Sequence, residues 1–350
     1  MKSVSAPVVE QPPLVDQLRQ ACGACCTWIL DAFARLLALP VPKDVNQAVS
    51  PDPTVYNDVV LIAISQTADP IELELNDELV QSLVQTEEVR KWEEHLYPYM
   101  SSLGAMSVHK ITPNILAKSH NDSEYATMEY VRANTRIPVP QPRFPHLKRW
   151  TAMDFIDATM LLACWDSLSW WMQLRIACTL RGYVRQLRAL TGTRPGPVTD
   201  GIIREHSLFD DQERGPFASS THFRVWCEFN AHSSWVSAMR TRQHYNIGGE
   251  GSDDPYPIMG GEWPLVFTHG DLHLGNIMLS KDGVLWVVDW AVSGFFPPWL
   301  ESVGIQYSQP PASFERYRWF ITGVYPEYEN FWGYFMGEVH RGFMIRPPAP

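Results

Sequence analysis

The segment FTHGDLHLGNIMLSKDGVLWVVDWAVSGF, residues 267–295, constrains the fold more than any other part of the chain. Two short apolar runs flank the turn sequence KDG at 281–283, and this pattern predicts a β-hairpin. Because hairpin strands run antiparallel, Asn276 at the start of the first strand and Asp289 after the second are expected at the same end. Amide and carboxylate oxygens suit a hard cation such as Mg²⁺. Asp271 lies one loop away, where it can act as a base or an orienting group.

The motif HGDLHLGN, followed by VVDW at the end of the hairpin, resembles the catalytic and metal-binding segments of the aminoglycoside phosphotransferase and choline kinase-like family. That resemblance implies an α+β, protein-kinase-like fold of two lobes, with a small β-rich N-lobe and a larger, mainly α-helical C-lobe. Protein kinases place Arg where this chain has Gly270, and Phe-Gly where it has Trp290 and Ala291. Both departures favour the small-molecule branch over a protein kinase, which is the third possibility.

The same resemblance implies the roles of five residues. Asp271 would accept or orient the proton of the acceptor hydroxyl, while Asn276 and Asp289 would hold Mg²⁺. Lys118 would contact the α- and β-phosphates of ATP and would be steadied by Glu124 at the start of the next helix. Positioning and charge neutralisation would then supply most of the rate.

The nucleotide site has two further predicted parts. Glu129 lies about one helical turn after Glu124 and is the competing partner of Lys118, but the position in the motif favours Glu124. The segment TAMDFIDATML resembles the link between the lobes in this family. Its backbone groups are expected to hold the adenine, around Met153, Asp154 and Phe155.

Other polar and aromatic side chains near the motif have two possible roles each. His269 is expected to fix the loop by hydrogen bonds rather than to act as a catalyst. His273 either lies near the transferred phosphoryl group or caps the loop, and capping is favoured. The side chains after the hairpin either line the acceptor side, where they would suit a cationic substrate, or pack the large lobe. These are Trp290, Phe295, Phe296, Trp299 and Glu301.

The hydrophobic pattern divides the chain into three parts. Residues 1–95 are predicted to form a helical N-terminal extension, residues 96–156 the N-lobe and hinge, and residues 157–350 the C-lobe with the catalytic and metal-binding loops.

Two amphipathic helices stand out in this pattern. In the extension, an apolar stripe predicts a helix packed on its own domain, formed by Ile29, Phe33, Leu36 and Leu37. Residues 161–191 also have a helical pattern. Their arginines are expected to form a solvated face, at Arg175, Arg181, Arg185 and Arg188.

Composition argues against several classes of function. The 350 residues carry a formal net charge of -11 and no basic stripe, so no nucleic-acid partner is expected. The apolar run around residues 27–41 contains Asp31 and Arg35 and is too short to cross a bilayer. No signal segment is evident at the start, so we expect a cytoplasmic protein without stable membrane insertion. The six cysteines suggest small buried thiols. The sequence does not indicate which oligomeric state the protein adopts.

The sequence therefore predicts a phosphotransferase that uses ATP and Mg²⁺ to move the γ-phosphoryl group to a hydroxyl of a small molecule. The acceptor is aminoglycoside-, choline- or metabolite-like, and fold resemblance does not choose among these. The alternative is a catalytically silent kinase-like module that binds nucleotide or a partner. Residues 101–108, SSLGAMSV, contain one glycine and no glycine-rich phosphate loop, although small-molecule relatives commonly lack one. The filled polar positions favour an enzyme.

Overall fold

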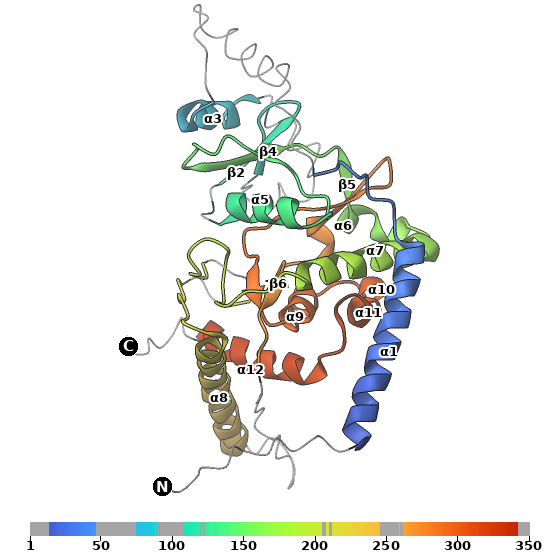
Figure 1. The fold of residues 1–350 in the computed structure, drawn as a ribbon. Coiled ribbons are helices and arrows are strands. Elements are labelled where there is room, and N and C mark those ends of the chain that lie inside the picture. The colour runs from blue at the N-terminus through green and yellow to red at the C-terminus, as the bar shows by residue number, and fades with distance from the viewer. Residues whose placement is uncertain are drawn as a thin grey trace, which may run out of the picture.

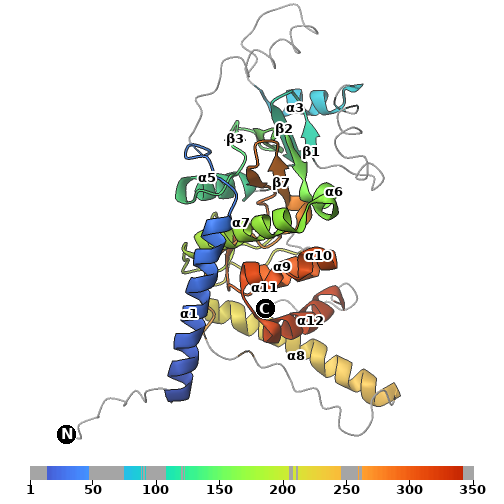
Figure 2. The same ribbon diagram turned by 90° about the vertical axis from the view of Figure 1, so that its right-hand side faces the viewer.

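The computed structural model describes residues 14–46, 75–87, 89, 91, 108–119, 121, 123–204, 208–209, 212–245, 259 and 262–341. A small sheet with one helix beneath it forms the upper part of the molecule, and helices dominate the lower part (Figures 1 and 2). This arrangement confirms the predicted α+β fold of two lobes. No helix within these ranges is long and apolar enough to cross a membrane.

The N-lobe contains an antiparallel sheet of order β1-β2-β4-β3. Its strands are β1 (Val108–Lys110), β2 (Ile115–Ser119), β3 (Pro142–Arg143) and β4 (Trp150–Asp154). Strands β1 and β2 pair around the turn at 112–114, with Val108 opposite Lys118. Side chains alternate along a strand, so Ile115 and Ala117 are buried on one face while Lys118 points to the other.

One helix of the N-lobe follows β2 directly. Helix α5 (Glu124–Asn134) buries Met128 and Val131, and both belong to a core that continues into the C-lobe. The opposite face of the sheet is covered by α3 (Asp77–Val84), whose Val80 and Leu83 pack with Ile115.

The C-lobe begins at the strand β5 (Ala158–Met160), which pairs with the predicted hairpin. The hairpin strands are β7 (Ile277–Ser280) and β8 (Leu285–Val287), and β6 (Val266–Thr268) pairs separately with β9 (Gly294–Phe296). Helices supply the rest: α6 (Leu161–Cys164), η2 (Trp165–Ser167), α7 (Trp170–Arg188), α8 (Ser220–Tyr245), η3 (Leu274–Asn276), α9 (Leu300–Tyr307), α10 (Ala312–Glu315), α11 (Arg318–Thr322) and α12 (Pro326–Arg341).

The hairpin forms as the sequence predicts. Ile277 pairs with Val287, and the N–H of Val288 donates to the carbonyl of Asn276 at 3.0 Å. Gly283 has φ +78°, a left-handed conformation that glycine adopts without strain. The antiparallel register therefore brings the two ends of the hairpin together, beside Asn276 and Asp289.

Helix α1 (Leu14–Leu37) runs beside the C-lobe and packs on α7 (Figure 2). The predicted helix is confirmed, but the prediction of which face packs against the domain is wrong. Asp31 and Ala34 are buried, whereas the apolar stripe faces outward and Leu36 is 85% exposed. A buried ion pair decides the orientation, because the Nε of Arg181 lies 2.7 Å from the Asp31 carboxylate.

The prediction of a solvated arginine face on α7 is correspondingly wrong for Arg181. Its side chain is buried, and it donates both to Asp31 and to the carbonyl of Phe320. Arg185 also contacts Asp31 but is itself exposed. An acidic residue on α1, far away in the sequence, is what allows a cation to be buried on α7.

The chain after α1 crosses from one lobe to the other. The N–H of Leu39 donates to Thr179 Oγ1 of α7 at 2.8 Å, and the Asn46 amide donates to the carbonyl of Ile137 at 2.7 Å. Within residues 1–95, the described helices α1 and α3 thus pack on different lobes, α1 on the C-lobe and α3 on the N-lobe.

Candidate active site

A lysine and two carboxylates meet between the lobes. The Nζ of Lys118 on β2 lies 2.5 Å from Asp289 Oδ1 and 3.2 Å from Glu124 Oε2. Lys118 faces away from the buried side of β2, and Glu124 is the first residue of α5, so local structure aims both at this point. Glu129 is exposed and instead interacts with Tyr125. Of the two predicted partners, Glu124 is the one that contacts Lys118.

Burial and charge oppose each other in this cluster. Burial raises the pKa of Glu124 to about 7, and the charge of Lys118 limits the rise. Burial lowers the pKa of Lys118, but the neighbouring Glu124 and Asp289 carboxylates outweigh burial and raise it above its ordinary value. Lys118 is therefore a cation held in place by two carboxylates, and it could also contact a negatively charged ligand.

Asp271 and Asn276 are joined within the loop that precedes the hairpin. The Asn276 amide Nδ2 donates to the backbone carbonyl of Asp271 at 2.9 Å and to its Oδ2 at 3.0 Å. Asn276 ends the short helix η3, whose tight turn brings its side chain back over Asp271. The predicted base and one predicted metal ligand are thus neighbours.

The backbone of this loop is fixed by a buried carboxylate. Glu301 accepts the N–H groups of His269 at 2.8 Å and Gly270 at 3.2 Å. Burial raises the pKa of Glu301 to about 7, while the His269 N–H and the charge of Arg188 oppose the rise. Gly270 has φ +81°, which lets the chain turn sharply just before Asp271.

His269 stabilises the same loop through its ring. Burial lowers its pKa to about 4, so the imidazole is neutral near pH 7. Its Nδ1 accepts the N–H of Asp271 at 3.3 Å, which leaves the proton on Nε2, 3.1 Å from the carbonyl of Val288. These contacts confirm the prediction that His269 fixes the loop.

Asp289 and Asn276 offer the oxygen ligands that a magnesium ion prefers. Asp289 has φ +63°, a conformation that Asp tolerates better than most residues, and its side chain is 40% exposed. The Asn276 amide nitrogen donates to Asp271, which leaves the amide oxygen available as a metal ligand. One carboxylate and one amide oxygen at one end of a hairpin fit Mg²⁺, which takes its other ligands from water and phosphates.

The hinge residues form part of the sheet. Met153 lies within β4 between Leu116 of β2 and Pro142 of β3. The N–H of Asp154 donates to the carbonyl of Gln141 at 2.9 Å, and the N–H of Phe155 to that of Asn114 at 2.8 Å. These two donors are engaged within the N-lobe, so an adenine ring at this segment would meet carbonyl groups or the residues that follow Phe155.

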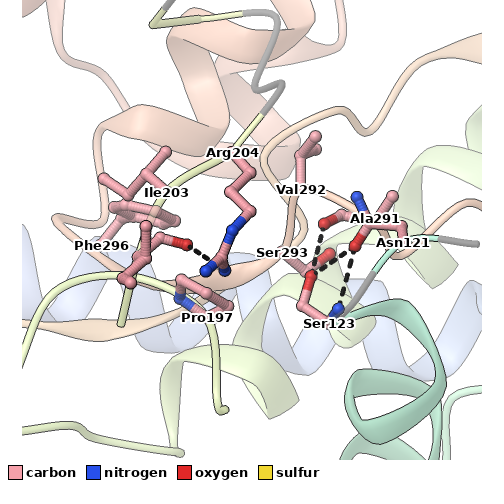
Figure 3. Close-up of a pocket in the computed structure, with 10 residues that line it drawn as sticks. Asn121, Ser123, Pro197, Ile203, Arg204, Ala291, Val292, Ser293 and Phe296 are labelled. Atoms are coloured by element: carbon pink, nitrogen blue, oxygen red, sulfur yellow. Dashed lines mark hydrogen bonds between the residues drawn. The ribbon is translucent and has the colours of Figure 1, made fainter. Parts of the chain in front are cut away.

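A small hollow lies beside the segment that follows Asp289 (Figure 3). Ala291, Val292 and Ser293 form one wall, and Ser123 donates across to the carbonyl of Ala291 at 2.9 Å. Its volume of about 10 Å³ has room for one water molecule. Arg204 borders it but is paired with Asp200 at 2.8 Å. The hollow is thus too small for a nucleotide and does not include Asp271.

One known family has a sequence model that matches the segment containing this loop. Residues 253–332 match the phosphotransferase enzyme family. The match confirms the predicted resemblance over Asp271, Asn276 and Asp289. No curated protein sequence matches the chain.

Solved phosphotransferase structures resemble the chain only distantly. A thermostable mutant of aminoglycoside phosphotransferase APH(4)-Ia aligns at 13% identity and TM-score 0.40, over 66% of this chain and 79% of that one. Macrolide 2′-phosphotransferase MphH from Brachybacterium faecium aligns at 13% and 0.40, over 73% and 99%. A mutant aminoglycoside 2′-phosphotransferase-IIIa, solved with GDP, aligns at 12% and 0.41, over 72% and 88%. Scores this low carry no argument about this chain.

The segment that matches the family model also contains the side chains that the sequence left between two roles. Trp290, Phe296 and Trp299 are buried, and Phe295 packs against Phe267, so they form core. The role of Glu301 in fixing the loop was missed, because its partners are backbone groups distant in the sequence. Its place as the one charged residue of α9, in the first turn of that helix, was the available signal.

Proposed function

We propose that this chain is a phosphotransferase that transfers the γ-phosphoryl group of ATP to a hydroxyl group of a small molecule. The observation that carries the proposal is the meeting of Lys118, Glu124 and Asp289 between the lobes, next to the linked pair of Asp271 and Asn276. A cation from the N-lobe and oxygen donors from the C-lobe are what a bound triphosphate needs on its two sides. The family match over residues 253–332 supports the same reaction class.

Each residue has a defined part in the proposed reaction. Lys118 binds the α- and β-phosphates, and Glu124 holds its ammonium group in place. Asn276 and Asp289 hold Mg²⁺, which when bound neutralises charge on the phosphates. Backbone groups around Met153, Asp154 and Phe155 flank the adenine.

Asp271 acts on the acceptor. The acceptor oxygen forms a bond to the γ-phosphorus as the bond from that phosphorus to the bridging oxygen of ADP breaks. The hydroxyl proton passes to the Asp271 carboxylate, and ADP leaves with the electron pair of the broken bond. The buried contacts of His269 and Glu301 keep the loop in position throughout, so little reorganisation is needed during transfer.

The rival proposal is a silent module that binds nucleotide without turnover. The two are distinguished by incubating the protein with Mg²⁺ and ATP across a panel of hydroxylated compounds and detecting products that gain one phosphoryl group by mass spectrometry. Asp271→Ala and Asp289→Ala should each lower turnover by about 10²-fold or more. Asp282→Ala, in the exposed hairpin turn, is the matched control and should leave turnover unchanged. Nucleotide binding without any phosphorylated product would support the silent module instead.

A further inference from the structure

His273 occupies an unusual place beside the proposed base. It is the N-cap of η3, and its Nδ1 accepts the N–H of Gly275 at 2.9 Å. A neutral imidazole has one donor and one acceptor nitrogen. Because Nδ1 accepts, the proton of the neutral ring is on Nε2.

That second nitrogen faces the Asp271 carboxylate. His273 Nε2 lies 3.4 Å from Asp271 Oδ2, the same oxygen that accepts from Asn276 Nδ2 at 3.0 Å. Asn276 Nδ2 therefore donates to this carboxylate oxygen, and His273 Nε2 lies close to the same oxygen. Two nitrogen atoms on either side of one oxygen restrict the rotation of the carboxylate, so its other oxygen is presented in a preferred direction.

Glycine at residue 275 leaves the space that the imidazole occupies. A Cβ at Gly275 would lie 2.7 Å from His273 Cε1 and 3.0 Å from Nδ1, closer than van der Waals contact allows. The ring therefore fills the space that glycine leaves, and the cap and the contact with Asp271 are made by the same ring orientation.

We infer that His273 is a positioning residue that orients the Asp271 carboxylate toward the acceptor hydroxyl through its Nε2–H group. Capping η3 through Nδ1 is the means by which the ring is aimed. The inference deepens the proposed function and rests on it for the role of Asp271. The contact between His273 and Asp271 can be measured without turnover, so the two can fail separately.

Two substitutions of His273 test the roles of the two ring nitrogens separately. His273→Asn places an amide oxygen where Nδ1 was, which keeps the cap and removes the donor to Asp271. His273→Gln reaches further and places an amide N–H donor near the former Nε2. His222→Asn, at an exposed histidine near the start of α8, is the matched control.

Turnover of ATP in the presence of Mg²⁺, with water or a hydroxylated compound as acceptor, gives the first readout. We expect His273→Asn to lower kcat about tenfold, the value of one lost hydrogen bond to a charged group, with KM for ATP unchanged. His273→Gln should recover most of kcat, and His222→Asn should match the wild type. Full kcat in His273→Asn together with low kcat in His273→Gln would show a cap alone and overturn the inference.

The second readout is the ring itself. Protein labelled with ¹⁵N-histidine should show His273 as the Nε2–H form, assigned by the loss of its signals in His273→Asn. The Nε2 shift should change in Asp271→Ala, whereas the Nδ1 shift, which reports the cap, should not. An Nδ1–H form, or an Nε2 shift indifferent to Asp271→Ala, would overturn the inference. Absence of turnover in the wild type with the expected shifts would overturn the proposed function and leave the contact established.

Discussion

The carboxylate of Glu301 accepts the backbone N–H of His269 at 2.8 Å, although the two residues are 32 positions apart in the chain. The same carboxylate accepts the N–H of Gly270. Two backbone N–H donors at the entrance to the loop that carries Asp271 therefore depend on one buried acidic side chain. The loop that carries Asp271 is thus fixed from α9 as well as by its own neighbours His269 and Asn276.

Replacing Glu301 should test this dependence. Glu301→Ala leaves two buried N–H groups without acceptors, at about 1–3 kcal/mol each in the free energy of unfolding. Glu301→Gln keeps one amide oxygen as an acceptor and should cost less. Denaturant unfolding measures both, with Glu327→Ala at an exposed position of α12 as the control, expected within about 0.5 kcal/mol of wild type. Equal stability of Glu301→Ala and the control would contradict the prediction.

His269 should make stability depend on pH in a defined window. Its pKa is lowered by burial from 6.5 to about 4 in the folded protein. Between these values the unfolded chain binds more protons, so the free energy of unfolding should fall as pH falls from about 6.5 to about 4. At about 1.4 kcal/mol per unit of pKa shift, the total amounts to a few kcal/mol.

Glu301 acts in the opposite direction, because burial raises its pKa from 4.5 to about 7. Its contribution is present below about pH 4.5 and lost as pH rises toward 7. The difference between wild type and His269→Gln therefore isolates the histidine. Urea unfolding from pH 4 to pH 8 should give a smaller fall on the acid side for His269→Gln, and parallel curves would exclude this role.

The ion pair between Asp31 and Arg181 should govern the docking of α1. Asp31→Ala leaves a buried guanidinium without its partner, which typically costs about 3–5 kcal/mol. The matched control is the exposed pair of Glu87 and Lys91, for which Glu87→Ala should cost under about 1 kcal/mol. Thermal unfolding would measure the stability change in both variants. Hydrogen exchange of the α1 amides would measure how firmly α1 is docked in Asp31→Ala. Unchanged exchange in Asp31→Ala would mean that α1 docks without the pair.

Lys118 should be needed for both stability and turnover, and the two effects can be separated. Lys118→Met removes the cation beside the buried Glu124 and should lower stability by about 3–5 kcal/mol. Adding Glu124→Gln removes the buried acid, so the double variant should regain much of the stability but none of the turnover. Recovery of turnover in the double variant would show that Lys118 does not bind phosphate.

The sequence predicted those parts of the site that depend on local pattern. The hairpin that joins Asn276 to Asp289 follows from two apolar runs and a glycine turn, and the structure confirms it. Glu124 was correctly placed beside Lys118 because a helix begins directly after the strand that carries the lysine. In each case the residues that decide the geometry are close in sequence.

Features decided by distant partners were predicted less well. Arg181 was expected in solvent because helical periodicity cannot show that Asp31 would pair with it. The apolar stripe around Leu36 was expected to pack, but α1 buries the face that carries Asp31 instead. Glu301 was left between two roles, since its partners are backbone N–H groups that a sequence does not display.

The residues between Leu39 and Asn46 limit how the two lobes can move. Leu39 is bonded to α7 in the C-lobe and Asn46 to Ile137 beside the N-lobe helix, and the short span between them reaches at most ~25 Å. A second link joins Val287 of β8 to the carbonyl of Pro138 at 3.0 Å. A wide rotation of the lobes about the segment after β4 would break these bonds. Under the proposed function, a nucleotide would then have to reach Lys118 and Asp289 without a wide rotation of one lobe against the other.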